Sequence, residues 1–212
     1  MDQKGIIFDL DGVLVSTDQY HYQAWKSIAD EIGVRFDEHI NDRLRGVSRM
    51  ESLDIILENY SGPVLTQGEK IALAERKNDR YRQLLCEMSP SSVSQSVRHT
   101  LETLRKKGYR LAVGSSSKNA KTILERVSLT QAFDAFSDGT NITRSKPDPE
   151  VFLKAAQFLH LEPFQCAVVE DARSGIDAAV RAGMLPIGIG DAAGYAQSTV
   201  SIRQLPELLN IF

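Results

Sequence analysis

Short apolar runs alternate with helical segments along most of this sequence, and this alternation limits the chain to few folds. Four runs rich in valine, isoleucine and alanine have the length of strands, at 5–8, 110–114, 166–169 and 185–189. Such continuous apolar runs are typical of strands buried on both faces of a parallel sheet. Between them lie segments with helical periodicity, at 97–107, 120–127, 150–159 and 174–182. The order predicts β-α-β units and an α/β fold with a doubly wound parallel sheet.

One long interval contains no strand-like run. From about residue 18 to about residue 88 the sequence shows only helical periodicity. Because this interval follows the first predicted strand almost directly, it indicates an all-helical domain inserted into the α/β core. We therefore expect residues 1–15 and 93–212 to form the core and residues 16–92 to form the helical domain. The second crossing, SPSSVS, has the serine and proline content of a linker.

The composition excludes several classes of function. The 212 residues carry a formal net charge of −3, with acidic and basic side chains interspersed, so no cationic field attracts nucleic acid or an anionic membrane. The apolar runs are shorter than the roughly 18 residues that span a bilayer. The N-terminal MDQKGIIFDL carries acids within its short apolar stretch, unlike a secretory leader. We expect a cytoplasmic protein with neither nucleic-acid nor membrane partners.

Two aspartates follow the first predicted strand. Asp9 and Asp11 are separated by one residue, and Gly12 lets the chain turn directly after them. Ligands of an open parallel sheet bind beyond the carboxyl ends of its strands, so a turn near Asp11 can bring both carboxylates to one ligand. One carboxylate can then act as a nucleophile and the other as a general acid or base. The alternative is that both aspartates only cap the turn between strand and helix.

Three further polar motifs lie at the ends of predicted elements. The segment from Gly114 to Asn119 places serines between a strand and a helix, where a phosphate can bind, although serines also cap helices. Lys146, beside prolines just before a helix, can neutralise a transferring phosphoryl group, unless it is a solvated loop lysine. Glu170 and Asp171 end the third predicted strand and, with Asp9, offer oxygen ligands that suit Mg²⁺.

The order of these motifs resembles the four motifs of the haloacid dehalogenase superfamily. They are Asp-Leu-Asp-Gly at 9–12, a serine after a strand at 115, Lys-Pro at 146–147 and Glu-Asp at 170–171. The resemblance covers the whole chain, and the helical insertion after the first motif is similar to the subgroup with a small helical cap domain. It implies a Rossmann-like catalytic core, an aspartyl phosphate formed on the enzyme, and one Mg²⁺ ion.

The helical segment narrows the resemblance to phosphosugar mutases of this superfamily. The similar features are His21 and Trp25 four residues apart on one predicted helical face, two arginines within 44–53, Arg-Lys-Asn at 76–78, and Ser-Lys-Asn at 117–119. Each feature has a structural alternative. His21 can be a structural histidine, Trp25 can belong to the core of the helical domain, and Arg49 can be a solvated charge.

The resemblance implies roles for the matching residues. Asp9 would be the nucleophile and Asp11 the general acid/base, while Ser115 and Lys146 would bind the transferring phosphate. Mg²⁺ would be held by Asp9, the backbone carbonyl of Asp11 and Asp171, with Glu170 close by. Arg49, Ser117 and Asn119 would bind the distal phosphate. The other substrate-binding residues would be His21, Trp25, Arg45, Gly46, Val47, Ser48, Ser52, Lys77, Asn78, Ser116 and Lys118.

The implied reaction interconverts β-D-glucose 1-phosphate and glucose 6-phosphate, with β-glucose 1,6-bisphosphate as intermediate and activator. A monomer that binds a small phosphosugar is expected. A Mg²⁺-dependent sugar-phosphate phosphatase would use the same two aspartates, and only His21, Arg49 and Lys77 favour the mutase. A signalling module that accepts phosphate on an aspartate is a third alternative. It would need neither an acid/base at Asp11 nor an elaborate helical domain.

Overall fold

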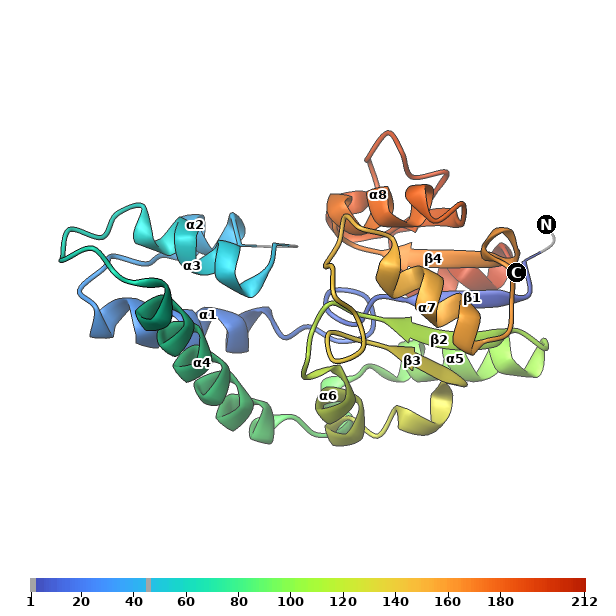
Figure 1. The fold of residues 1–212 in the computed structure, drawn as a ribbon. Coiled ribbons are helices and arrows are strands. Elements are labelled where there is room, and N and C mark those ends of the chain that lie inside the picture. Colours follow the sequence, from blue (N-terminus) through green and yellow to red (C-terminus); the bar gives the residue numbers. More distant parts are fainter. Residues whose placement is uncertain (1–2, 45–46) are drawn as a thin grey trace. The chain divides into compact units, whose positions relative to one another are not determined.

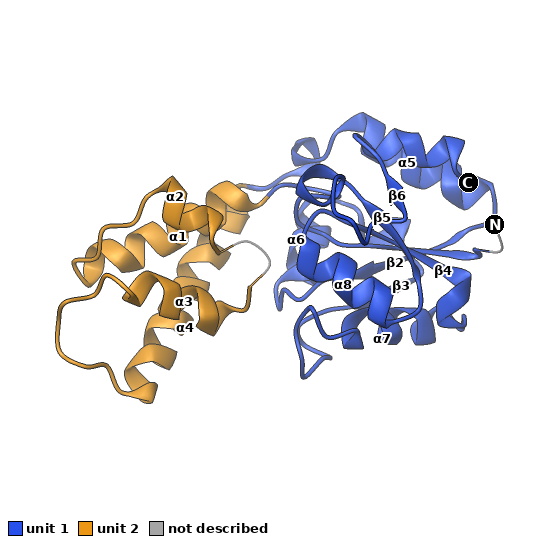
Figure 2. Ribbon diagram, turned by 90° about the horizontal axis from the view of Figure 1, so that it is seen from above, with its two compact units in different colours: residues 1–16, 88–212 blue, residues 17–87 orange. Residues whose placement is uncertain are grey.

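The computed structural model describes residues 3–44 and 47–212 and divides the chain into two compact units. Unit 1 comprises Met1–Ser16 and Met88–Phe212, and unit 2 comprises Thr17–Glu87 (Figure 2). The second crossing thus lies earlier than the position between residues 92 and 93 that the sequence suggests. The reason is local, because the Arg98 guanidinium donates to the backbone oxygens of Pro90 and Val127, at 2.7 and 2.6 Å. These bonds fasten the segment after Met88 to unit 1.

Unit 1 contains a six-stranded parallel sheet in the order β3-β2-β1-β4-β5-β6 (Figure 1). The strands are β1 (Gly5–Phe8), β2 (Arg110–Gly114), β3 (Ala135–Ser137), β4 (Cys166–Glu170), β5 (Leu185–Gly188) and β6 (Val200–Ser201). β1 lies in the middle, and its last residue, Phe8, pairs with Val113 of β2 and Val169 of β4. The predicted α/β fold with a doubly wound parallel sheet is confirmed. The carboxyl ends of β1, β2 and β4 therefore meet at one edge of the sheet.

Helices cover both faces of this sheet. They are α5 (Gln95–Lys106), α6 (Ala120–Arg126), α7 (Glu150–Phe158) and α8 (Arg173–Arg181). α7 and α8 lie on one face and α5 on the other (Figure 2). Phe152 of α7 and Ala178 of α8 are fully buried in one hydrophobic cluster with Ile7 and Val168 of the sheet. Burial of the strands on both faces explains why their sequences are continuously apolar rather than alternating.

The regular elements of unit 2 in its described part, residues 17–44 and 47–87, are all helices. They are α1 (Asp18–Glu31), α2 (Glu38–Asp42), α3 (Arg49–Leu57) and α4 (Gln67–Leu84). α4 begins with a capping box, in which Thr66 Oγ1 accepts from the Glu69 N–H while the Glu69 carboxylate accepts from the Thr66 N–H. The helices enclose a separate hydrophobic core that includes Trp25 and Leu53.

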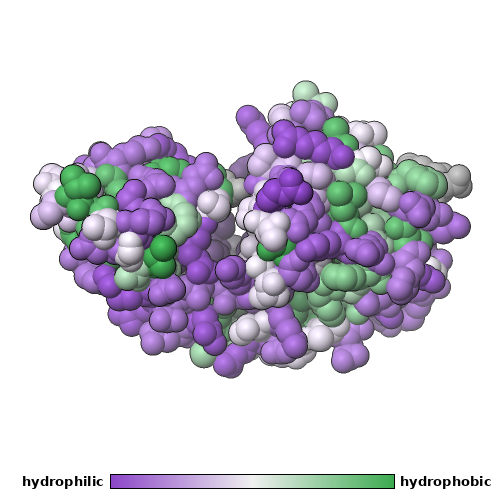
Figure 3. Space-filling view, in the orientation of Figure 1, coloured by the Kyte–Doolittle hydropathy of each residue, from purple (hydrophilic) through white to green (hydrophobic). Residues whose placement is uncertain are grey.

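The surface of both units is predominantly polar on the face that Figure 3 shows, with hydrophobic residues scattered between polar ones. Isolated exposed apolar side chains such as Val64 and Phe164 are normal on folded proteins. Among the helices of the described chain, none is at once long and apolar enough to traverse a bilayer.

Candidate active site

A carboxylate-lysine cluster lies at the carboxyl edge of the sheet in unit 1. Asp9 follows β1 directly, and its N–H donates to the Val169 oxygen at 2.9 Å, which extends the β1–β4 ladder by one residue. The Lys146 ammonium donates to Asp9 Oδ1 and, at 2.7 Å, to Glu170 Oε2. The side chains are 10% exposed at Asp9, 8% at Lys146 and 1% at Glu170. Three charged groups from distant parts of the sequence thus lie together in a site with little exposure to solvent.

The turn after β1 depends on a glycine. Gly12 has a φ of +74°, and a Cβ at this position would overlap the carboxylate of Asp171. The turn is held by the Gly12 N–H, which donates to the Val15 oxygen at 2.9 Å. Gly175, in the first turn of the helix that follows β4, makes room for a second carboxylate, because a Cβ there would overlap the Glu170 carboxylate. Both glycines give the carboxylates their close approach to neighbouring backbone.

Burial dominates the ionisation of the cluster. It raises the pKa of Asp9 to about 7, although the Lys146 charge opposes this change. Burial, with the charge of Asp9, raises the pKa of Asp171 to about 7. Burial also raises the pKa of Glu170. For Lys146, burial acts to lower the pKa, but Asp9 and Glu170 outweigh it and raise the pKa, so the lysine stays an ammonium.

The same carboxylates fit a divalent cation. Asp9, Glu170 and Asp171 each offer one oxygen, and these three oxygens lie within 4.8 Å of one another. Hard oxygen ligands of this kind suit Mg²⁺, which binds through a few carboxylates and keeps some of its waters. A cation would also offset the repulsion from Glu170 that contributes to the raised pKa of Asp9 and the repulsion from Asp9 that contributes to the raised pKa of Asp171. The donor set present therefore matches the Mg²⁺ expected from the sequence.

The serine loop after β2 is ordered by its own hydroxyls. Ser115 is buried, and its Oγ accepts from the Ser117 N–H at 3.2 Å. The Ser117 Oγ in turn accepts from the Asn119 N–H at 3.2 Å. The Ser116 hydroxyl is buried without a hydrogen-bond partner among the described residues, while Lys118 is exposed. The N–H groups of Ser117 and Asn119, in the segment where a phosphate was expected to bind, are thus already bonded to serine hydroxyls.

An aromatic ring lies beside the lysine of the cluster. The Lys146 Nζ is 4.8 Å from the centroid of the Phe152 ring, which is fully buried beneath the loop. Gly114 makes room for this ring, because a Cβ there would lie 2.7 Å from Phe152 Cδ1. A cation above an aromatic face gains electrostatic energy where water is scarce. The ring thus adds a favourable contact to those that the ammonium makes with its carboxylates.

A second polar cluster lies within unit 2. Lys77 of α4 is 4% exposed, and its ammonium lies 2.8 Å from His21 Nδ1. The ammonium also lies 5.0 Å from the Trp25 ring centroid and 4.7 Å from that of Tyr81. Burial and the charges of Lys77 and Arg49 hold the pKa of His21 well below its usual range. A neutral imidazole that accepts at Nδ1 carries its proton on Nε2, so His21 offers an N–H donor there.

The other substrate-binding residues expected in unit 2 differ in their burial and in their contacts. The Arg49 Nη2 donates to Asn78 Oδ1 at 2.9 Å. Ser48 is the N-cap of α3, and Ser52 is buried one turn later. Val47 is partly buried. Arg45 and Gly46 lie outside the described residues.

The positions of two aromatic residues in unit 2, Trp25 and Tyr81, could not be decided from the sequence. The Trp25 ring is 3% exposed within the core of unit 2, which is the structural alternative that the periodicity left open. Tyr81, which we did not single out, stacks at 4.1 Å from the His21 ring and donates to Thr17 Oγ1 at 3.0 Å. Its position four residues after Lys77 on one helix face was the available signal.

A cavity of about 530 Å³ lies at the other end of the sheet, lined by residues that include Lys4, Arg110 and Gln165. These residues start or precede β1, β2 and β4, whereas Asp9 and Glu170 stand where β1 and β4 end. Ligands of open parallel sheets bind at the carboxyl ends of the strands. The cavity is therefore separate from the carboxylate-lysine cluster.

A doubly wound parallel sheet whose carboxyl edge gathers an aspartate, a lysine and further carboxylates defines an α/β enzyme. The family model described as "Hydrolase: haloacid dehalogenase-like hydrolase" matches residues 3–183. The chain belongs to the haloacid dehalogenase-like hydrolase family.

Individual relatives agree with the expected resemblance to β-phosphoglucomutase. The β-phosphoglucomutase of Bacillus subtilis is 38% identical over 206 residues, covering 97% of this chain and 91% of its own length. The crystal structure of β-phosphoglucomutase from Clostridium difficile superimposes with a TM-score of 0.88 at 34% identity, covering 97% of this chain and 93% of that one. The phosphorylated carbohydrates phosphatase of Thermotoga maritima is 31% identical over 216 residues, covering 98% of this chain and 97% of its own. The resemblance is confirmed, and the relatives include both mutases and phosphatases.

Proposed function

We propose that this protein is a β-phosphoglucomutase, which interconverts β-D-glucose 1-phosphate and glucose 6-phosphate through β-glucose 1,6-bisphosphate. The observation that carries the proposal is the polar cluster of unit 2, in which buried Lys77 fixes neutral His21 and Asn78 orients Arg49. Hydrolysis of a sugar phosphate requires one phosphate site, whereas a bisphosphate intermediate requires two. Arg49 offers a planar fork for a second phosphate, and the relatives include β-phosphoglucomutases.

The chemistry centres on Asp9. Its carboxylate attacks phosphorus, the bond to the departing sugar oxygen breaks, and an aspartyl phosphate results. Asp11 donates a proton to the departing oxygen and removes one from the hydroxyl that later takes the phosphoryl group back. The Lys146 ammonium and Ser115 hold the phosphate and compensate its charge. Mg²⁺, when bound by Asp9, the Asp11 carbonyl and Asp171, would neutralise further charge on the transferring group.

Unit 2 would supply the contacts to the rest of the substrate. Arg49 would bind the distal phosphate, a role that is also proposed for Ser117 and Asn119, and His21 would donate a hydrogen bond from Nε2 to the sugar. Exclusion of water protects an aspartyl phosphate from hydrolysis. The monomeric state and the cytoplasmic location remain predictions.

The alternative is a phosphatase for small sugar phosphates, supported by the 31% identical phosphatase relative. It would use the same Asp9 and Asp11, with water in place of the second sugar hydroxyl. The carboxylate-lysine cluster alone does not separate the two reactions.

The test is ³¹P NMR of the protein with Mg²⁺, β-glucose 1-phosphate and a trace of the 1,6-bisphosphate, with the α-anomer in a parallel sample. We expect glucose 6-phosphate from the β-anomer and none from the α-anomer. Arg49→Ala is expected to weaken phosphosugar binding and to slow the mutase reaction. Free phosphate as the main product would assign the protein to the phosphatases instead.

A further inference from the structure

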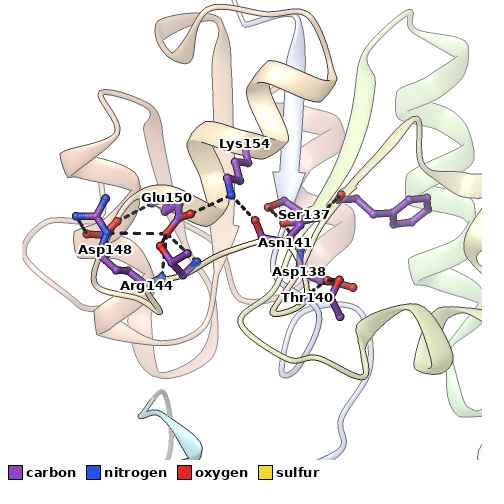
Figure 4. Close-up of polar contacts among 10 residues, drawn as sticks. Ser137, Asp138, Thr140, Asn141, Arg144, Asp148, Glu150 and Lys154 are labelled. Carbon is purple, nitrogen blue, oxygen red and sulfur yellow. Dashed lines mark hydrogen bonds and ion pairs between the residues drawn. The ribbon is translucent and has the colours of Figure 1, made fainter.

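The carboxylate of Glu150 closes the loop that carries Lys146. Lys146 lies between β3 and α7, and Glu150 is the first residue of α7. Glu150 Oε2 accepts three hydrogen bonds from the start of the loop, from the Thr143 N–H at 3.0 Å, the Thr143 hydroxyl at 2.9 Å and the Arg144 N–H at 2.8 Å. The carboxylate thus joins both ends of the short segment in which Lys146 stands (Figure 4).

Further contacts fix this carboxylate and the same segment. Lys154, one helical turn later, lies 2.9 Å from Glu150 Oε1 and also donates to the Asn141 carbonyl at the end of the preceding turn. Asp148 pairs with Arg144 at 3.1 Å and accepts from the Glu150 N–H at 3.0 Å. Figure 4 shows these residues as one continuous polar network from Asn141 to Lys154.

Glu150 is ionised at neutral pH. Its hydrogen bonds from Lys154, Arg144 and Thr143 lower its pKa to about 2. Within the described part of the chain, the Glu150 side chain bonds to this loop and to Lys154, whereas Asp9 and Glu170 are bound by Lys146. Any effect of Glu150 on the reaction must therefore act through the loop.

We propose that Glu150 is the positioning residue for Lys146, holding the loop so that the Lys146 ammonium meets the phosphoryl group on Asp9. A lysine side chain has four rotatable bonds, and its reach depends on where its backbone is anchored. The Phe152 ring contacts the ammonium, and Glu150 fixes the backbone from which the Lys146 side chain extends. Small displacements of a charge-neutralising group cost large factors in rate. The inference rests on the proposed role of Asp9 and applies equally to a mutase and a phosphatase.

A purely structural role is the competing explanation. An acidic residue in the first turn stabilises a helix through the helix dipole, and Glu150 occupies that place in α7. Such a role predicts lower stability and the same proportional loss of activity whether or not Lys146 is present. A positioning role predicts that the loss disappears when Lys146 is removed.

The experiment measures release of phosphate from acetyl phosphate with Mg²⁺, a reaction that needs the Asp9 centre and no sugar. Glu150→Gln keeps the side-chain size but loses the charge, and its single amide oxygen can no longer accept both from the loop and from Lys154. We expect kcat to fall about 10-fold to 100-fold, as for other misplaced catalytic groups. The matched control is Glu102→Gln, which removes another i,i+4 Glu–Lys pair on an exposed helix of unit 1 and is expected to leave kcat within about twofold.

The decisive comparison repeats Glu150→Gln in a Lys146→Met background. A double-mutant cycle isolates coupling between two residues, so we expect the second substitution to change the residual rate by less than about twofold. An equal proportional loss in both backgrounds would overturn the proposal, as would a single variant with unchanged kcat.

Two controls keep the result interpretable. Thermal unfolding reports whether the Glu150→Gln variant folds. If that variant does not fold, Thr143→Val is used in its place, because it removes one of the three hydrogen bonds to Glu150. We expect Thr143→Val to lower kcat about two- to threefold. The Thr143→Val loss must also vanish without Lys146, or the proposal is wrong. A wild-type protein that forms no aspartyl phosphate and releases no phosphate would contradict the proposed function itself.

Discussion

At the scale of single residues, burial raises the pKa values of carboxylates in the carboxylate-lysine cluster. Asp9 and Asp171 both have a pKa of about 7, chiefly because burial disfavours their charged forms. Lys146 compensates one part of that charge, since it pairs with Asp9 and Glu170. Because Lys146 does not compensate all of the negative charge, the ionisation of the site depends on pH and on bound cations.

We expect the metal-free protein to lose stability as pH rises from about 4 to about 7. Asp9 and Asp171 hold protons up to pH 7 when folded but release them near pH 4 when unfolded. In this window the folded state binds more protons, so the free energy of unfolding falls with pH. Mg²⁺ binds the ionised carboxylates and is therefore expected to raise Tm more at pH 8 than at pH 5.5. Thermal unfolding by circular dichroism with EDTA and with Mg²⁺ provides the measurement.

Asp171→Asn is the control for this pH effect. It removes one of the two titrating carboxylates, so the fall in stability across the window and the gain from Mg²⁺ must both shrink. An Asp171→Asn protein with the wild-type pH profile would show that other groups cause the trend.

Gly12→Ala should be costly for two separable reasons. Alanine at a φ of +74° is strained by about 1 kcal/mol, and its Cβ would overlap the Asp171 carboxylate. Gly183→Ala is the matched control, because Gly183 has a φ of +72° and a Cβ there would meet no atom within 4 Å. We expect both variants to lose stability in urea unfolding and only Gly12→Ala to bind Mg²⁺ more weakly. Equal Mg²⁺ affinity in the two variants would contradict the close approach.

At the scale of elements, α4 brings a buried ammonium to the polar cluster of unit 2. Lys77→Met keeps an apolar side chain of similar length, and replacing a buried charge in this way is often neutral or stabilising. We expect an unchanged or higher Tm, together with a roughly 100-fold slower mutase reaction, because His21 loses the partner that fixes its tautomer. Thermal unfolding and the ³¹P assay measure the two effects.

Tyr81→Phe should show the opposite pattern. It removes the buried hydrogen bond to Thr17, at a cost of about 1 kcal/mol, and leaves the ring beside Lys77 and His21. Stability is expected to fall while turnover changes little. A large loss of activity in Tyr81→Phe would mean that the hydroxyl itself contributes to the reaction.

The sequence predicted elements well where the apolar pattern was long enough to read. β1 and β2 have the expected bounds, and β4, β5 and the four core helices differ by one or two residues at their ends. β3, β6 and α2 were not predicted, because they have three, two and five residues. Such short elements are fixed by pairing or packing with neighbours rather than by their own pattern.

The sequence predicted those residues of the candidate site that belong to recognisable motifs, and it did not predict those that depend on side-chain packing. Asp9, Glu170 and Asp171 follow from the rule that carboxyl ends of parallel strands meet, whereas Lys146 was predicted from its place beside prolines just before a helix. The Glu150 network and the Tyr81 contacts depend on side-chain rotamers within a loop and a helix pair, which periodicity does not encode. The position of Trp25 was open, since a stripe facing a core and a stripe facing a ligand have the same helical spacing.

At the scale of the whole molecule, ligands should protect the two units separately. Mg²⁺ with inorganic phosphate is expected to slow amide hydrogen exchange in unit 1, at 9–15, 114–119 and 142–149, and to leave unit 2 unchanged. Glucose 6-phosphate should add protection in unit 2 around His21 and Arg49. Hydrogen-exchange mass spectrometry compares the two ligands, and protection of unit 2 by phosphate alone would contradict the division of roles.

The insertion of unit 2 after β1 also has a consequence for how the chain is made. Gly5 of β1 pairs with Arg110 and Cys166, so β1 leaves the ribosome long before either neighbouring strand has been synthesised. Unit 2 is closed by contacts within Thr17–Glu87, and local contacts form early while distant pairings form late. During translation the helical unit is therefore expected to fold first. The apolar strand β1 (GIIF) stays unpaired until β2 and β4 have been synthesised. We therefore expect a chaperone to bind this segment during translation.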